Sequence, residues 1–414
     1  MNNIISNNIV STNSNGRVAY LDMLKCLGMF IVVSGHIHIA YGWFSLPIHS
    51  YVIPLYFMLS GMTFRRSKFP KFVDFAKHRA KTLLLPYAMF SVITWAFWSL
   101  YSYFTHAMVE SYWMPLLQTI LAQGSGRYLV HNVPLWFVPC LFVVEMIYYW
   151  LDKLPNWGKV LASVVLAVIG SLMIHVWKGV FILLPWSIES AFASVIFYCV
   201  GNLLVKRYGL KGIETIVLGK RALSIVTIII LTVVLVFTAH YNQHISLGSD
   251  LMGKSPFLFY FNAFIGIITI GLFSILICSI SSDNKVFKSI MDYHLWFGRN
   301  SFYIMATHVP VKGVIMAAMA TLIGKSVHFV GNDWVCMPVV FVLTCAVCSV
   351  LAVWIGKLKK IDEQRHINTP SLPSCRSTSR PRLRASRRRC PRSRRDAAPS
   401  WTDRAVRRNG SHSS

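Results

Sequence analysis

The chain is poor in charged residues, and poorest in acidic ones. Of its 414 residues only 14% are charged, with 15 Asp and Glu against 41 Lys and Arg, whereas 55% are hydrophobic. A water-soluble domain of this length cannot hide so much apolar surface in its core. The composition therefore excludes an ordinary soluble protein and indicates one that lies largely in a lipid bilayer.

The sequence also lacks the signatures of several common sites. It has no P-loop, no dinucleotide-binding glycine fingerprint, no clear internal repeat and no signal peptide, since residues 1–16 are rich in Asn and Ser and uncharged. Its nine cysteines form no disulfide framework, because seven lie in or beside apolar segments. Cys345 and Cys348 have the spacing of a metal or redox pair, but no second pair accompanies them. We interpret them as packing residues and expect no metal site.

The net charge of +26 is unevenly distributed. From Thr369 to Ser414 the chain has 13 Arg, no Lys and two Asp, so this stretch supplies +11 of the total. Its Arg, Ser and Pro content predicts disorder. So abrupt a change of residue usage indicates a reading-frame or fusion scar rather than an arm for nucleic acid or anionic lipid. We expect a disordered segment at 1–17, a membrane domain at 18–360, a disordered tail at 361–414 and no nucleic-acid partner.

Ten apolar segments could cross the roughly 30 Å of bilayer hydrocarbon, which takes about 20 helical residues. The second is short and contains Pro54 and Gly61. Together the ten segments predict an all-α polytopic membrane protein with about ten transmembrane helices. The segments are Leu21–Tyr41, Tyr51–Phe64, Thr82–Tyr103, Pro134–Leu151, Val160–Trp177, Leu183–Val205, Leu223–His240, Pro256–Ile280, Leu295–Ile323 and Val335–Ile355.

Lys and Arg alternate between the loops of this arrangement. With a cytoplasmic N-terminus, 21 of them lie in inside segments, and the outside loops hold only Arg127, Lys178, Lys254 and Lys325. Short cytoplasmic loops of membrane proteins carry an excess of Lys and Arg. The alternation therefore predicts that both termini are cytoplasmic.

Two predicted spans carry a cation followed by a histidine. In the first, His36 follows Lys25 by eleven residues, which places it about 16 Å farther along the helix and on nearly the same face. In the ninth, which runs in the same direction, His308 follows Arg299 by nine residues, or about 13.5 Å. Ionisable side chains inside a bilayer are costly and usually functional. The pattern predicts cations near the cytoplasmic face and imidazoles near mid-membrane.

Other polar residues in the spans have simpler interpretations. A lone cation often reaches for the interface, and a lone histidine often bonds to a neighbouring helix, but matched depths in two helices argue against both. We interpret His38 as structural and Lys312 as an interfacial anchor. Glu145 and Glu189 are either pocket residues or hydrogen-bond partners between helices.

These residues resemble membrane-bound acyltransferase family 3, in particular its fucose 4-O-acetylase-like branch, over about residues 18–360. Five pieces occur in the family's order, which makes the resemblance specific. They are Lys25-x10-His36, similar to the basic-x10-His signature; the second-span run Pro54–Gly61; Leu84-Leu85-Pro86-Tyr87 after a basic loop; the Leu-Trp-Phe segment within Pro134–Val138; and Gly298-x2-Ser301 ahead of His308.

The resemblance implies an integral-membrane O-acyltransferase of the bacterial inner membrane. Such an enzyme moves an acetyl group from acetyl-CoA, which is a donor substrate and not a bound cofactor, to a hydroxyl of a surface polysaccharide or lipid-linked glycan. His36 is then the general base, and Lys25 and Arg299 bind the phosphates of the donor. His308 is the second catalytic residue, and Ser60, Trp136 and Tyr303 bind substrate and shape the reacting centre.

The sequence departs from the family at position 25, where many members carry Arg in place of Lys, and the two cations grip phosphate differently. We expect no second catalytic domain after the last span. The main alternative is a proton-coupled secondary transporter, since ten spans with intramembrane His and Glu also describe one, although no repeat relates two halves here. A noncatalytic membrane scaffold is a third interpretation.

Overall fold

The computed structural model describes residues 17–37, 45–105, 109–124, 129–176 and 184–368. The chain falls into two units, Met1–Ile361 and Asp362–Ser414. The second is described only over 362–368, which are helical; all the helix packing and the candidate site belong to the first. The predictions for 1–16, for His38 and for the tail from Thr369 onward lie outside the described residues.

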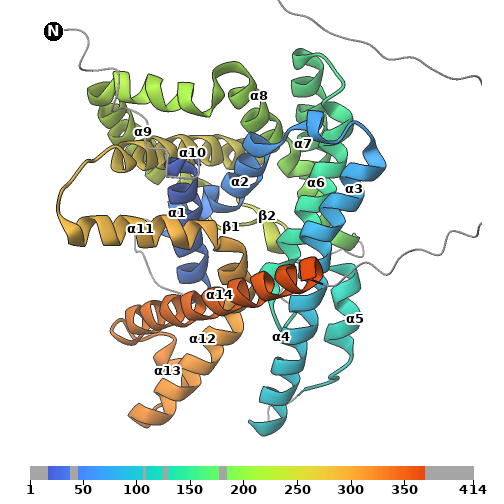
Figure 1. The fold of residues 1–414 in the computed structure, drawn as a ribbon, viewed down its shortest axis with the longest axis vertical. Coiled ribbons are helices and arrows are strands. Elements are labelled where there is room, and N and C mark those ends of the chain that lie inside the picture. Colours follow the sequence, from blue (N-terminus) through green and yellow to red (C-terminus); the bar gives the residue numbers. More distant parts are fainter. Residues whose placement is uncertain (1–16, 38–44, 106–108, 125–128, 177–183, 369–414) are drawn as a thin grey trace, which may run out of the picture. The chain divides into compact units, whose positions relative to one another are not determined.

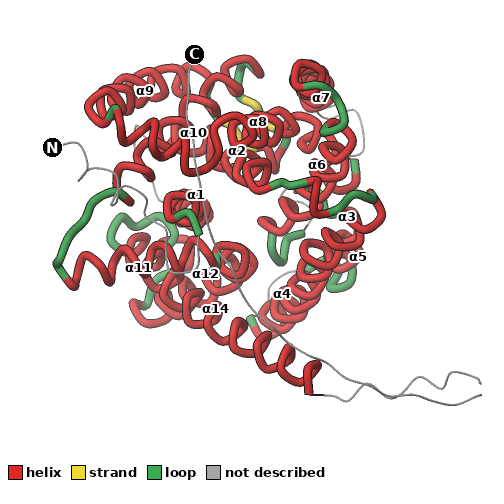
Figure 2. The backbone as a smooth tube through the Cα atoms, turned by 45° about the horizontal axis from the view of Figure 1, so that its top comes forward, coloured by secondary structure: helices red, strands yellow, loops and turns green. Residues whose placement is uncertain are grey.

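The described chain is almost entirely helical, which confirms the all-α class (Figures 1 and 2). The longer helices are α1 (Ala19–His36), α2 (Ser45–Thr63), α3 (Phe72–Arg79), α4 (Leu85–Phe104), α5 (Met114–Leu121), α6 (Phe137–Leu151), α7 (Asn156–Val176), α8 (Ile188–Gly219), α9 (Arg221–Asn242), α10 (Pro256–Cys278), α11 (Lys285–Arg299), α12 (Ser301–Ile323) and α14 (Cys336–Asn368). The short elements are η2 (Arg66–Lys68), η3 (Ala80–Leu84), η4 (Val133–Trp136), η5 (Pro185–Ser187), η6 (Leu247–Ser249), α13 (Val327–Val330) and the antiparallel strands β1 (Ile245–Ser246) and β2 (Leu251–Met252).

Nine helical stretches within the described residues are long and apolar enough to cross a membrane. The predicted span that is missing from them corresponds to α2, which is 19 residues long but contains Pro54 and several polar residues. Because α2 packs against α1, α8 and α10, much of its surface meets protein instead of lipid. Polar side chains are tolerated on such buried faces. The protein is a multi-pass membrane protein, and the side on which its termini lie stays a prediction.

The third span begins earlier than its apolar pattern predicts. α3, the π-helical turn η3 and α4 form one stretch, Phe72–Phe104, where we predicted Thr82–Tyr103. Pro86, in the first turn of α4, has no N–H to donate to the carbonyl of Thr82. The wide turn η3 lies where this hydrogen bond is missing.

The predicted span Leu295–Ile323 is wrong, because the structure divides it between two helices. α11 ends at Arg299 and α12 begins at Ser301, and Figure 1 shows α11 running across the view while α12 descends from its end. Arg299 and His308 therefore do not share a helix, and the 13.5 Å expected along one helix does not apply. Hydropathy missed the break because it cannot distinguish an apolar side chain that faces lipid from one that is buried in the protein. Leu295 is of the second kind, since it is buried against α1.

α2 and α8 cross closely in the larger apolar core. A side-chain carbon on Gly61 would meet the backbone carbonyl of Tyr198, and one on Gly201 would meet that of Met58. Small residues at such crossings let membrane helices approach. By contrast, α4, α9 and α14 expose many large apolar side chains, as expected of helix faces that meet lipid.

Candidate active site

The rings of His36 and His308 lie against each other. His36 is the last residue of α1 and is half-buried, whereas His308 lies within α12 and is fully buried. Their ring centroids are 5.1 Å apart, and the ring planes are inclined at 53°. The packing of α1 against α12 thus brings together the two histidines predicted to be catalytic.

His308 is held in one tautomer. Its Nδ1 lies 2.8 Å from the carbonyl oxygen of Met305 and 3.1 Å from that of Ile304. Carbonyl oxygens only accept hydrogen bonds, so Nδ1 carries the ring proton of the neutral imidazole. Nε2 then bears a lone pair, and it is buried without a hydrogen-bond partner among the described residues. This ring can therefore accept a proton or a hydrogen bond at Nε2.

Lys312 joins the end of α1 to α12. It lies one turn beyond His308, and its Nζ donates a hydrogen bond of 2.9 Å to the backbone carbonyl oxygen of His36. The last carbonyls of a helix lack intrahelical donors and form the negative end of its dipole, so a cation stabilises them. We predicted an interfacial anchor, whereas the structure makes Lys312 a link between helices beside the paired rings.

Asn132, which precedes η4, contacts the same part of α12. Pro310 lies inside α12 and has no N–H to donate to the carbonyl of Ala306, four residues earlier. The Nδ2 of Asn132 takes this place with a hydrogen bond of 2.7 Å to Ala306. Asn132 was not among the residues predicted from sequence, although a proline within a span signals that one carbonyl needs a donor from elsewhere.

His131, the neighbour of Asn132, lies in the loop before η4 and is only 3% exposed. Neither of its ring nitrogens has a hydrogen-bond partner among the described residues. Burial lowers the pKa of His131 to about 4, because loss of water disfavours the charged ring. This imidazole is therefore neutral at physiological pH.

Lys25 and Arg299 come together around Asp22. The Nζ of Lys25 lies 3.8 Å from a carboxylate oxygen of Asp22, which also interacts electrostatically with Arg299 and Arg17. α11 packs along α1, and a side-chain carbon on Gly298 would meet the carbonyl of Asp22, so glycine permits this approach. The predicted pair of cations is thus formed by packing of α11 on α1 instead of by one continuous ninth span.

Trp136 ends the turn η4, which also contacts α12. The residue is 5% exposed, and its indole packs so closely against two glycines that a side-chain carbon on Gly124 or on Gly248 would collide with it. Gly248 belongs to the loop between β1 and β2. Trp136 is therefore a packed residue between this loop and the segment that carries Asn132.

Two other predicted binding residues lie apart from His308. Ser60 is half-buried on α2, where its carbonyl accepts a hydrogen bond from Thr63. Tyr303 lies five residues before His308, hence on a different face of α12, and its ring centroid is 6.4 Å from that of Phe90 on α4. Among the described residues, no hydrogen bond or ring contact joins Ser60 or Tyr303 to His308.

Of the two alternatives for Glu145, the structure selects the hydrogen-bond partner between helices. Its carboxylate forms a bidentate ion pair with the guanidinium of Arg79, at the end of α3. The sequence placed Arg79 in a cytoplasmic loop, but it is helical and faces α6. Glu189, near the start of α8, interacts electrostatically with Asp250, and one of its buried carboxylate oxygens has no hydrogen-bond partner among the described residues.

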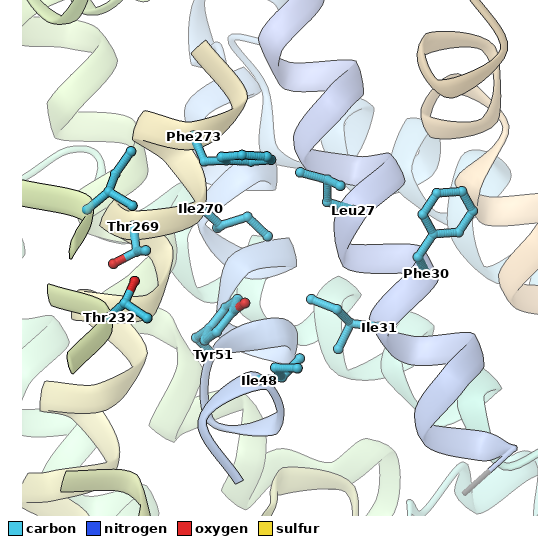
Figure 3. Close-up of a pocket in the computed structure, with 10 residues that line it drawn as sticks. Leu27, Phe30, Ile31, Ile48, Tyr51, Thr232, Thr269, Ile270 and Phe273 are labelled. Atoms are coloured by element: carbon cyan, nitrogen blue, oxygen red, sulfur yellow. The ribbon is translucent and has the colours of Figure 1, made fainter. Parts of the chain in front are cut away.

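An apolar groove of about 390 Å³ lies between α1, α2, α9 and α10 (Figure 3). Leu27 and Ile31 of α1 face Tyr51 and Ile270 across it, and the lining contains no ionisable group other than the tyrosine. None of the residues predicted for catalysis or binding lines it. The groove suits hydrocarbon and is separate from the histidine pair.

The site as described offers two imidazoles, on α1 and α12, and a cluster of cations, on α1 and α11. Within the described ranges, no group of three or more His, Cys, Asp or Glu side chains is placed to hold a metal ion. The arrangement is thus equipped for proton transfer at the imidazoles and for holding an anionic group near Asp22.

Comparison with known proteins identifies the family. A family model described as an acyltransferase domain, that of acyltransferase family 3, matches residues 18–353. No curated protein and no solved structure gave a match. Because the matched region includes most of the chain, both histidines and both cations, the chain belongs to acyltransferase family 3.

Proposed function

We propose that this acyltransferase moves an acetyl group from cytoplasmic acetyl-CoA to a hydroxyl of a surface polysaccharide or lipid-linked glycan, in a bacterial plasma membrane. The observation that carries the proposal is the contact between His36 and His308, whose ring centroids are 5.1 Å apart. Transfer of an acyl group to a hydroxyl needs a proton acceptor beside the attacking oxygen, and imidazole is the commonest one.

His36 is the general base of the proposed reaction. It takes the proton of the acceptor hydroxyl as that oxygen attacks the thioester carbonyl carbon. The new C–O bond forms, the C–S bond breaks, and the proton passes to the departing coenzyme A sulfur. His308 packs against His36 with its own tautomer set by the carbonyl oxygens of Met305 and Ile304.

Lys25 and Arg299 bind the phosphates of the donor. Arg299 is exposed and the Lys25 side chain is 33% exposed, so both can meet a water-soluble anion. Their common neighbour Asp22 has a single carboxylate, which cannot neutralise both cations. Charge-assisted hydrogen bonds from Lys or Arg to phosphate are among the strongest that proteins make.

The acceptor side has uneven support. Trp136 lies on a turn that contacts α12 and stays in the proposed binding set. Ser60 and Tyr303 belong to the same proposed set, but their packing gives no link to His308, so the proposal depends on them least.

The test compares His36→Ala and His308→Ala with the unaltered protein, purified in lipid nanodiscs. The probes are coenzyme A labelled in its acetyl group and surface polysaccharide freed of its esters by mild alkali. Loss of a general base lowers acyl transfer by about 10²- to 10⁴-fold. If the two rings act as a unit, the double variant is little worse than either single one.

His328→Ala is the matched control, because His328 is exposed on the short helix α13. It should transfer acetyl at the unaltered rate. Retention of transfer by His36→Ala would remove the base assignment. If even the unaltered protein leaves the acetyl group on coenzyme A, the proposed function is wrong and the result favours the transporter alternative.

A further inference from the structure

Two buried hydrogen-bond acceptors lie where the segment before η4 contacts α12. One is Nε2 of His308, whose other nitrogen is engaged by backbone carbonyls. The other is Oδ1 of Asn132, whose Nδ2 donates to Ala306. Both residues are fully buried, and neither acceptor atom has a hydrogen-bond partner among the described residues. The carbonyl oxygens that hold the two side chains belong to consecutive residues, Met305 and Ala306, so both side chains lie against the same turn of α12.

The chemistry of both side chains is set by the partners they already have. The contact with the carbonyl of Ala306 requires the amide nitrogen of Asn132, so the amide cannot be flipped and Oδ1 faces elsewhere. The tautomer of His308 likewise leaves Nε2 with a lone pair. Leaving a buried acceptor unpaired is costly, and two such atoms together are uncommon. A ligand that brought hydrogen-bond donors would relieve this cost.

We propose that Oδ1 of Asn132 and Nε2 of His308 form the subsite that receives hydroxyl groups of a polyhydroxylated acceptor, beside the base His36. This inference rests on the proposed function and names the part of the chain that recognises its acceptor. A hydroxyl donates one hydrogen bond, so a sugar bearing more than one hydroxyl can satisfy both acceptors. An acceptor without hydroxyl groups beyond the one that reacts leaves at least one of them unpaired.

In this arrangement the subsite aligns the acceptor and does not itself exchange protons. One hydroxyl loses its proton to His36 and attacks the thioester. Hydroxyls elsewhere on the same sugar keep their protons and donate to Asn132 and His308. Asn132 is therefore an acceptor-binding residue, and its loss should raise the KM for the acceptor far more than the KM for acetyl-CoA.

The experiment must separate this role from the bond between Asn132 and Ala306, which supports α12. Pro310 supplies the means, since Pro310→Ala restores a backbone N–H that can donate to the Ala306 carbonyl. Four proteins are compared: the unaltered chain, Asn132→Ala, Pro310→Ala and the double variant. Asn262→Ala is the matched control, because Asn262 is also fully buried but bonds to Thr238, between α9 and α10. The probes are acetyl-CoA and alkali-treated surface polysaccharide, and thermal unfolding is followed in parallel.

Asn132→Ala should lose thermal stability, and the double variant should recover most of it. The KM for polysaccharide should stay raised in the double variant, relative to Pro310→Ala, by about tenfold, the equivalent of one hydrogen bond. The KM for acetyl-CoA should change little in the double variant. In the control Asn262→Ala, both KM values should change little. Recovery of the polysaccharide KM in the double variant would show that Asn132 only supports α12, and would overturn the inference. Failure of the unaltered protein to acetylate polysaccharide would instead overturn the proposed function.

Discussion

The Nζ of Lys312 donates a hydrogen bond of 2.9 Å to the backbone carbonyl oxygen of His36, 276 residues away in the sequence. This bond attaches the last turn of α1 to α12 directly beside the contact of the two histidine rings. The distance between the rings of His36 and His308 therefore depends on a lysine that takes no part in the proposed reaction.

Lys312→Met should lower kcat for acetyl transfer by about 10- to 100-fold, since hydrogen bonds of charged groups contribute roughly 1.5–3 kcal/mol. The KM for acetyl-CoA should change little, because the cations around Asp22 are unaltered. Lys312→Arg should restore part of kcat. Lys325→Met is the control, as Lys325 is exposed in the loop before α13. Steady-state kinetics of the purified variants decide the matter, and an unchanged kcat in Lys312→Met would contradict a positioning role.

Lys25→Ala should raise the KM for acetyl-CoA several-fold, and Lys25→Arg should restore it, if a cation at this position binds phosphate. The effect is modest because the side chain is partly exposed and water screens the charge. Added salt should weaken donor binding to the unaltered protein more than to Lys25→Ala. Lys288→Ala, also exposed and on α11, is the control. Equal KM increases in both alanine variants would indicate a general effect of surface charge.

Removal of one partner of the Arg79–Glu145 pair should destabilise the protein by about 3–5 kcal/mol, because the remaining charge is left buried and unpaired. The pair joins α3 to α6 through a bidentate contact. Glu145→Leu should therefore unfold at lower temperature in detergent than the double variant Arg79→Met/Glu145→Leu, which buries no charge. A double variant as unstable as the single one would argue that the pair itself, and not the orphaned charge, sets the stability.

The pH dependence of stability should include a contribution from His131. Its pKa is about 4 in the folded protein against an ordinary value of 6.5, so the unfolded chain binds more protons between these limits. The contribution of His131 to the free energy of unfolding is thus complete above pH 6.5. It is lost as pH falls toward 4, by on the order of 3 kcal/mol in all. Thermal unfolding in detergent at stepped pH should show a shallower acid loss in His131→Gln. Identical slopes would mean that His131 gains a proton as readily folded as unfolded.

Much of the fold was predictable because the bilayer imposes a simple rule on sequence. Each apolar run of sufficient length corresponds to helix, and the points at which the structure differs from the predicted pattern have local causes. α2 falls short in composition because its partners are helices and not lipid. The start of the third span was missed because Arg79 looks like a loop residue until Glu145 is seen beside it. The break after Arg299 was missed because apolar residues of α11 pack on α1.

The candidate site divides in the same way. His36, His308, Lys25 and Arg299 were identifiable from sequence, since charge or imidazole within an apolar run is costly and stands out. Asn132 was not, because an Asn at the end of a loop is ordinary until Pro310 is known to leave the carbonyl of Ala306 open.

By itself, then, the sequence determined that this protein lies in a lipid bilayer, and it determined the helical class, the family and the residue types of the site. It could do so because polar groups are costly in hydrocarbon, and this cost is visible in the order of residues. Only the tertiary structure decided which groups meet: the two imidazoles, the cations around Asp22, and the bonds made by Lys312 and Asn132. Those contacts join helices far apart in the chain. They depend on how each helix is rotated and where it crosses its neighbours, and hydropathy carries no record of either.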